Sequence, residues 1–236
     1  MFKDKPVISN QHGALVMALI PFLYAIFTSH FHYQHLFLGL SWLFLYFCSY
    51  PFLALFSKKP TARNKKWASI YAALALVFAL PVVFYQPAIL QFTLPILPLA
   101  GLQIYYAKRK DERNLINDLA GILTFGLVGM AAAYLVTETY NWAILLHPAL
   151  FFMATTLYIK SVARERRNPL YLKLSLGSHL ILGLIYALLG QYGLALAYGL
   201  GLLRAAIIPR KNLNVKQVGM LEFPVVLIFF IALIFS

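Results

Sequence analysis

The chain has 236 residues, of which 61% are hydrophobic, 16% are aromatic and only 11% are charged, and its mean hydropathy is +0.75. This composition lies far outside that of a water-soluble domain of the same length and indicates a membrane protein. The net charge of +13 does not indicate nucleic-acid binding. Its cations lie in short clusters between apolar runs, where membrane orientation and anionic lipid head groups account for them.

Two long uncharged runs occupy most of the first half of the chain. Residues 6–57 and 67–107 contain no Asp, Glu, Lys or Arg and are 52 and 41 residues long. Because about 20 helical residues cross the hydrocarbon core, each run is long enough for two crossings. The polar breaks "SHFHYQH" at 29–35 and "YQP" at 85–87 supply the turns. Both runs therefore predict helical hairpins, and their apolar residues on every face exclude a transmembrane barrel.

The second half of the chain predicts five further helices. Residues 119–159 carry a single charge, Glu138, whose polar surroundings divide the run into a third hairpin. The 30 uncharged residues 174–203 are either one long tilted helix or two short helices around "GQYG" at 190–193. Two helices keep all 20 Lys and Arg residues on one side, whereas one helix moves the last basic cluster across, against the positive-inside rule. We therefore favour two helices here, and residues 218–235 predict the final crossing.

These patterns predict an all-α fold. It is a polytopic membrane helix bundle of about nine transmembrane helices, with a cytoplasmic N-terminus and an external C-terminus, in one domain spanning residues 1–236. Six of the seven carboxylates lie on the basic side with the Lys and Arg residues, and only Glu138 lies on the other. Because acids contribute little to orientation, their position indicates either ion-paired networks that shape this surface or a ligand site.

Polar residues at the helix ends on the basic side are the sharper candidates, because such groups are costly near hydrocarbon. "NQHGA" places His12 at the start of the first helix, and "NDLAG" places Asp118 in the first turn of the fifth. His179 lies one turn or more into the seventh helix, Arg204 lies about one turn before the eighth ends, and Glu222 opens the ninth.

With the basic loops, these residues predict one cytoplasm-facing cavity between the first, fifth, seventh and eighth helices, where arginines offer paired donors to a phosphate or carboxylate. Helix capping, helix-dipole pairing and snorkelling are the alternative explanations. The candidate ligand-binding residues are Gln11, His12, Lys108, Arg109, Glu112, Arg113, Asn117, Asp118, Lys160, Arg164, Glu165, Arg166, Asn168, His179, Arg204 and Glu222.

The sequence predicts no metal site. His30, His32 and His35 have a spacing that could place three imidazoles on a metal, but no carboxylate or cysteine lies near them. Histidines are also common in polar interface loops, and the sequence does not identify any cofactor.

Three segments carry a resemblance to a known family. "NQHGALVMALIPF", "YYAKRKDERNLINDLAGI" and "KSVARERRNPLY" followed by "SLGSH" resemble the YwiC-like family of bacterial integral membrane proteins. The resemblance covers nearly the whole chain and implies a multi-pass protein of the bacterial cytoplasmic (inner) membrane. It implies no biochemical activity.

A more distant resemblance is to the UbiA-type prenyltransferases, which have nine helices and a cytoplasmic active site. The segment "YYAKRKDERNLINDLAGILTFG" is similar to their Tyr…Lys-Arg…Gly pattern between the fourth and fifth helices. Those enzymes hold Mg²⁺ with two aspartate-rich loops, after the second and sixth helices. Here the first loop, "SYPFLALFSKKPTARNKK", has no acid, and the second, "KSVARERRN", has only Glu165. If this chain is an enzyme, the resemblance implies a prenyltransferase-like transferase without the metal motifs.

Three hypotheses on function follow. The first is a protein that binds an amphiphile with an anionic head group, such as an isoprenoid or lipid, in a cytoplasmic funnel. The second is a non-catalytic partner or assembly factor of a membrane complex, and the third is a small-anion transporter. Transporters often have broken helices and mid-membrane charges. Pro81, Pro95 and Pro98 predict helix breaks, whereas mid-membrane charges are absent from the predicted spans. The partners expected in all cases are membrane lipids.

Overall fold

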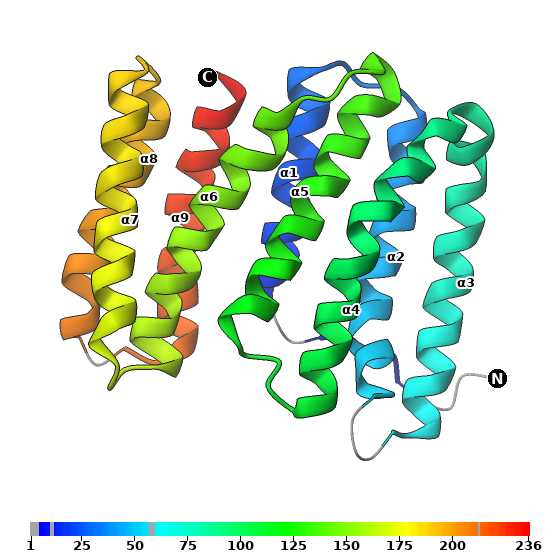
Figure 1. Ribbon diagram of the computed structural model, residues 1–236, viewed down its shortest axis with the longest axis horizontal. Helices are drawn as coiled ribbons and strands as arrows, with labels where there is room; N and C mark the ends of the chain where they lie inside the picture. Colours follow the sequence, from blue (N-terminus) through cyan, green and yellow to red (C-terminus); the bar gives the residue numbers. More distant parts are fainter. Residues whose placement is uncertain (1–4, 10–11, 57–59, 212) are drawn as a thin grey trace. The chain divides into compact units, whose positions relative to one another are not determined.

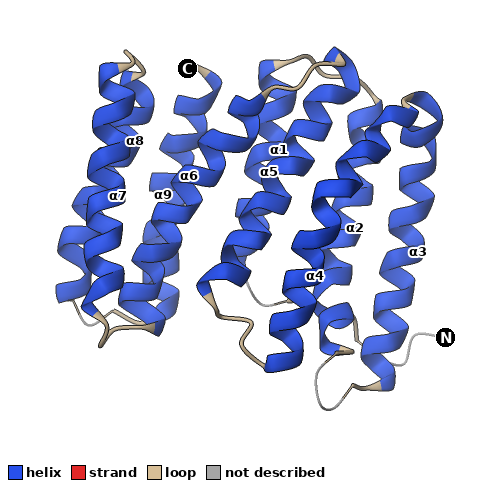
Figure 2. Cartoon of the chain, viewed as in Figure 1, coloured by secondary structure: helices blue, strands red, loops and turns tan. Residues whose placement is uncertain are grey.

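The computed structural model describes residues 5–9, 12–56, 60–211 and 213–236. Within these ranges the chain is helical and has no strand (Figure 2). The α-helices of the described chain are α1 (His12–Thr28), α2 (Gln34–Ala54), α3 (Ala62–Tyr85), α4 (Thr93–Arg109), α5 (Leu115–Thr137), α6 (Trp142–Ile159), α7 (Pro169–Leu188), α8 (Tyr192–Ile207) and α9 (Val215–Ile234). The all-α prediction and its nine helices are confirmed for the part of the chain that is described.

Seven of these helices are long and apolar enough to cross a membrane, judged by length and composition among the described residues. The exceptions are α1 and α8, which are apolar but have only 17 and 16 residues. The orientation and the nine crossings stay predictions.

The choice of two helices around "GQYG" is confirmed. α7 ends at Leu188 and α8 begins at Tyr192, and Gly190 between them has a φ of +76°. This left-handed conformation is open to glycine at little cost, so the sequence "GQYG" closes the turn where a continuous helix was the alternative.

Proline placement differs from the sequence prediction. Pro81 lies inside α3 and Pro98 lies inside α4, so these two residues do not break their helices, and Pro95 lies in the first turn of α4. A proline in a membrane helix is tolerated because neighbouring groups satisfy the backbone oxygen that it frees. In this region the chain instead forms a short 3₁₀ helix at Pro87–Phe92, between α3 and α4.

The described chain divides into two compact units, residues 1–146 and 147–236, and the division falls inside α6. We call them unit 1 and unit 2 and describe each by itself. The single domain that the sequence predicts stays a prediction.

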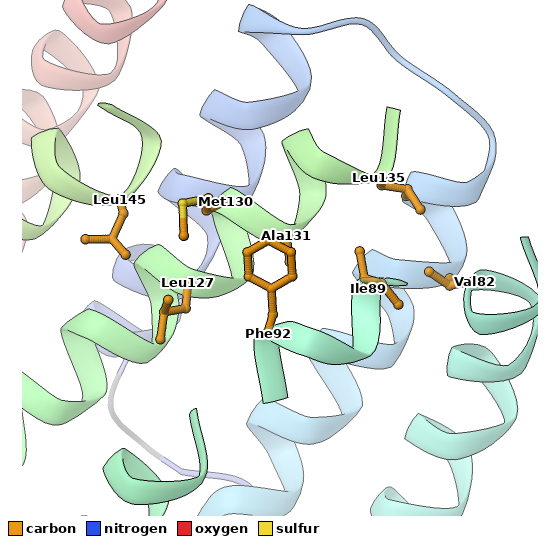
Figure 3. Close-up of a cluster of buried hydrophobic side chains, with 8 residues drawn as sticks. All are labelled: Val82, Ile89, Phe92, Leu127, Met130, Ala131, Leu135 and Leu145. Atoms are coloured by element: carbon orange, nitrogen blue, oxygen red, sulfur yellow. The ribbon is translucent and has the colours of Figure 1, made fainter. Parts of the chain in front are cut away.

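Unit 1 is built from paired helices (Figure 1). α2 packs along α3, and α5 packs against both α1 and α4. Figure 3 shows the apolar cluster that joins the 3₁₀ helix to α5, formed by Val82, Ile89, Phe92, Leu127, Met130, Ala131, Leu135 and Leu145. α1 and α5 approach so closely that a Cβ on Gly129 would lie 2.6 Å from the carbonyl oxygen of Pro21. The α1–α5 contact therefore depends on a glycine at this position.

Unit 2 packs α8 between α7 and α9. The ring of Phe151 on α6 stacks on Phe229 of α9, with centroids 3.8 Å apart. α6 ends in one π-helical turn at Lys160–Arg164, a form that is rare and frequent at functional sites. Beside this turn, Tyr158 and Val162 pack with Ala205 and Val218, which brings the ends of α6, α8 and α9 together at the basic loops.

Candidate functional site

Most candidates of unit 1 lie at the end of α4, in the loop that follows it and at the start of α5, and much of this segment is used for its own structure. Lys110 adopts a left-handed conformation that ends α4. Asn114 caps α5, since its side chain accepts from the backbone N–H of Ile116 at 3.0 Å and donates to Asp111 at 2.8 Å. Asn117 donates to the backbone oxygen of Glu112 at 2.7 Å. Asp111 and Asn117 therefore shape the turn.

The two cations in the last turn of α4 lie against aromatic rings of unit 1. The guanidinium of Arg109 lies 5.0 Å from the ring centre of Tyr105, and the ammonium of Lys108 lies 5.6 Å from that of Phe56. Glu112 and Arg113 are exposed, and Asp118 lies half-buried in the first turn of α5 as expected. Gln11 lies outside the described residues, and for His12 the structure gives only its place as the first residue of α1.

The candidates of the α6–α7 loop in unit 2 are also partly committed to structure. Asn168 caps α7 through the N–H of Leu170 at 3.0 Å. Arg166 donates to the backbone oxygens of Val162 and Leu213, which ties this loop to the start of α9. Lys160 is buried, with its ammonium 5.9 Å from the ring of Tyr171. Arg164 and Glu165 are exposed.

A pocket of about 460 Å³ lies beside this loop, and we call it the basic pocket. Its cationic residues are Arg166, Arg167 and Lys211, with Asn168 as a further polar group. Its apolar wall includes Val162, Leu172, Ile208, Leu213 and Val218. The pocket therefore combines positive charge with a hydrocarbon-like wall at the basic end of unit 2.

A second feature of unit 2 is a set of buried polar side chains from all four of its helices. Tyr158 comes from α6, His179 from α7, Tyr198 and Arg204 from α8, and Glu222 from α9. We call this set the buried polar cluster. Tyr158 and Tyr198 are inaccessible to solvent, and the exposed fractions of His179 and Arg204 are 1% and 6%.

Arg204 is the centre of the buried polar cluster. Its Nη1 forms an ion pair with Oε2 of Glu222, and its guanidinium lies 4.3 Å from the ring centre of Tyr158. An arginine held over an aromatic ring gains a cation–π attraction that strengthens away from water. Snorkelling, an alternative explanation of Arg204, is therefore wrong, because this side chain is buried and paired with a carboxylate inside the unit.

His179 is fixed from two sides. Its Nδ1 lies 2.7 Å from the backbone oxygen of Ser175, and a Cβ on Gly201 would collide with its Cδ2 and Nε2 atoms. The glycine of α8 therefore makes room for the imidazole of α7. His179 also lies 6.2 Å from Tyr198, between ring centres.

Several hydrogen-bonding groups of the buried polar cluster have no partner within the described protein. Among the described residues no partner lies within reach of the hydroxyls of Tyr158 and Tyr198, Nε2 of His179, Nε and Nη2 of Arg204, or Oε1 of Glu222. A buried polar group without a partner costs about 1–3 kcal/mol, and such groups are rare in folded proteins. Tyr158 and Glu222 both contact Arg204, and this gathering of unpaired groups marks the place as a candidate site.

The sequence prediction found part of this arrangement. It named His179, Arg204 and Glu222, and Arg204 lies one turn before the end of α8 as expected. Glu222 does not open α9, because the capping box at Asn214 starts the helix earlier, at Val215. Tyr158, Tyr198, Arg167 and Lys211 were missed. The convergence of candidates from both units on one cavity stays a prediction.

His35, in the first turn of α2, serves the fold of unit 1. Nε2 of His35 lies 2.9 Å from the backbone oxygen of Ala132, and Nδ1 accepts from the backbone N–H of His32 at 3.0 Å. Both ring nitrogens are therefore engaged. In the part of the chain that is described, no group of three or more His, Cys, Asp or Glu side chains is arranged to hold a metal.

Comparisons with known proteins identify relatives. The family model described as YwiC-like protein matches residues 8–134. An uncharacterized protein of Haemophilus influenzae is 47% identical over 233 residues, which cover 98% of each chain. The uncharacterized protein YwiC of Bacillus subtilis is 38% identical over 221 residues, which cover 92% of each chain. No solved structure matches.

Proposed function

This chain belongs to the YwiC-like family, and we propose that it binds an amphiphile with an anionic head group in the basic pocket of unit 2. The head group lies against Arg167 and Lys211, and the hydrocarbon chain runs along Val162, Leu172 and Ile208. The protein performs this role as a multi-pass protein of the bacterial inner membrane, with the pocket on the cytoplasmic side.

The observation that carries the proposal is the composition of the basic pocket. An anionic head group needs cations that are not already committed, and a hydrocarbon chain needs a contiguous apolar wall beside them. Arg167 and Lys211 are exposed at the rim, while Val162 and Val218 are buried at the base. The volume of about 460 Å³ lies within the range of pockets for small molecules.

The predicted orientation of the chain supports this role. The pocket is formed by the α6–α7 and α8–α9 segments, which carry two of the basic clusters that the positive-inside rule assigns to the cytoplasm. Arg166 binds two backbone oxygens and closes the wall of the pocket. The resemblance to UbiA-type prenyltransferases makes an isoprenoid chain the first candidate for the apolar part.

Lipid analysis of the purified protein tests the proposal. The protein is purified from membranes in mild detergent, and bound amphiphiles are extracted and measured by mass spectrometry against the total membrane extract. The test variant is Arg167→Gln with Lys211→Gln. The matched control is Lys65→Gln with Lys173→Gln, which removes the same charge from exposed positions outside the pocket.

We expect the wild type and the control to carry the same enriched anionic amphiphile. The pocket variant should lose it at least tenfold, because hydrogen bonds to charged groups contribute about 1.5–3 kcal/mol each. Equal amphiphile in both variants, or no enrichment in the wild type, refutes the proposal. A stoichiometric second protein in the same preparation would instead support a partner or assembly factor.

A further inference from the structure

The buried polar cluster contains two neighbouring donor atoms that have no hydrogen-bond partner among the described residues. Nη1 of Arg204 is paired with Glu222, and one face of the guanidinium lies on Tyr158. The remaining in-plane donors, Nε and Nη2, are buried and have no partner among the described residues. These two atoms are neighbours on one edge of the guanidinium, and this edge matches the two oxygens of a carboxylate or phosphate.

The cluster also has acceptor atoms that lack a hydrogen-bond partner among the described residues. The backbone oxygen of Ser175 can only accept, so Nδ1 of His179 carries the hydrogen and donates to it at 2.7 Å. Nε2 of the neutral ring is then an acceptor, and it is unpaired within the described chain. Oε1 of Glu222 is a second unpaired acceptor among these residues. The hydroxyl of Tyr158, whose ring lies against Arg204, can donate or accept.

A ligand for this set must therefore offer oxygens that accept and a hydrogen that donates. A group with accepting oxygens alone leaves Nε2 of His179 and Oε1 of Glu222 without partners. Charge sets the same requirement, since Glu222 already balances Arg204 and an added unprotonated dianion is costly in a buried place. An oxyacid that retains a proton meets both conditions.

We propose that the buried polar cluster binds an oxyacid group that carries a proton, a carboxylic acid or a hydrogen phosphate. Its oxygens lie on the Nε–Nη2 edge of Arg204, and its O–H donates to Glu222 or His179. Arg204 lies three residues before the end of α8, about 4.5 Å along the helix axis, so the site lies about one helical turn from the basic end of unit 2. This site uses other residues than the basic pocket and does not depend on the proposed function.

Phosphate and sulfate discriminate this proposal from general anion binding. Both are tetrahedral oxyanions of similar size, but near neutral pH phosphate retains one or two hydrogens and sulfate has none. Equilibrium dialysis of the purified protein in detergent against radiolabelled inorganic phosphate or sulfate, at constant ionic strength, gives the two dissociation constants. We expect phosphate to bind at least tenfold more tightly than sulfate.

Two variants connect the binding to the cluster. Arg204→Lys retains a charge for Glu222 but lacks the Nε–Nη2 edge, and we expect phosphate binding to weaken more than tenfold. Tyr158→Phe keeps the ring under the guanidinium and loses only the hydroxyl, and we expect a loss of about three- to tenfold. Tyr71→Phe, which alters a buried tyrosine of unit 1, is the matched control and should bind as the wild type does.

The outcomes separate clearly. Equal binding of phosphate and sulfate, no phosphate binding, or unchanged binding in both cluster variants overturns the proposal. If Arg204→Lys does not elute as a folded protein in size-exclusion chromatography, Tyr158→Phe decides. Arg167→Gln with Lys211→Gln should keep phosphate binding, so failure of the amphiphile proposal and failure of this one are distinguishable.

Discussion

Replacing Gly201 by alanine should destabilise unit 2 through the imidazole of His179. An added Cβ would collide with Cδ2 and Nε2 of this ring. The ring cannot turn away freely, because His179 is buried and its Nδ1 is bonded to the backbone oxygen of Ser175. The α7–α8 contact at this position therefore has no room for a methyl group.

The size of the effect follows from two costs and one gain. Overpacking in a well-packed core costs about 1–3 kcal/mol, and displacing the ring breaks a hydrogen bond of roughly 1 kcal/mol. Alanine in place of glycine gains about 1 kcal/mol of helix propensity. Gly199→Ala lies in the same helix with nothing within 4 Å of its added Cβ, so it has the gain without the costs. The difference between the two alanine variants is therefore about 2–4 kcal/mol.

Equilibrium unfolding in mixed detergent micelles, followed by circular dichroism, measures this difference. We expect Gly199→Ala to be at least as stable as the wild type and Gly201→Ala to be clearly less stable. Adding His179→Ala should remove most of the steric cost of Gly201→Ala, which a double-mutant cycle detects. Equal stability of the two alanine variants would show that the α7–α8 packing described above is wrong.

Three further predictions concern the two units and the topology. Gly129→Ala should lower the free energy of unfolding by about 3 kcal/mol, at the top of the overpacking range, because its Cβ would meet the backbone of Pro21. Gly121→Ala lies in the same helix with its nearest neighbour at 4.0 Å and is the control in denaturant unfolding. Equal losses of stability in the two variants would contradict the close α1–α5 contact. Glu222→Ala should lower the free energy of unfolding by about 3–5 kcal/mol because it leaves Arg204 buried without its carboxylate. Adding Arg204→Met to the same chain should restore much of this stability. If the two substitutions instead give additive losses in denaturant unfolding, the pairing is refuted. In a Cys48→Ala background, Thr139→Cys should react with a membrane-impermeant maleimide in intact cells and Lys65→Cys only in opened cells; the reverse pattern would invert the predicted orientation.

The helices were predictable because hydrocarbon imposes a simple rule on the sequence. Runs of more than 40 residues with no charge or a single one must turn once inside, and polar breaks marked the turns that the structure has after Thr28, Tyr85 and Thr137. Exact ends were less predictable. α9 begins at Val215 because Asn214 and Gln217 form a capping box, a local hydrogen-bonding pattern that hydropathy does not register.

The site was predictable only where a residue conflicts with its surroundings. Three polar residues lie in or beside apolar runs, namely Arg204, His179 and Glu222. The free-energy cost of a polar side chain near hydrocarbon is by itself enough to make them candidates. Tyr158 and Tyr198 are two of 15 tyrosines in the chain, and tyrosine is ordinary in membrane helices. Their unpaired hydroxyls become apparent only when four helices of unit 2 pack together. The same holds for Gly201, whose role depends on the ring of His179 from another helix.

The Arg204–Glu222 pair also bears on the topology argument itself. The positive-inside rule counts cations that stay in water beside the membrane, whereas Arg204 is buried and its charge is balanced inside unit 2. Of the last basic cluster, Arg210, Lys211 and Lys216 remain to orient the chain. Three cations without an acid among residues 205–216 still favour the predicted cytoplasmic side, and the separate helices α7 and α8 bring the α8–α9 segment to the same end of unit 2 as the α6–α7 loop. The burial of Arg204 and its pair with Glu222 thus indicate a role inside unit 2 rather than in orienting the chain.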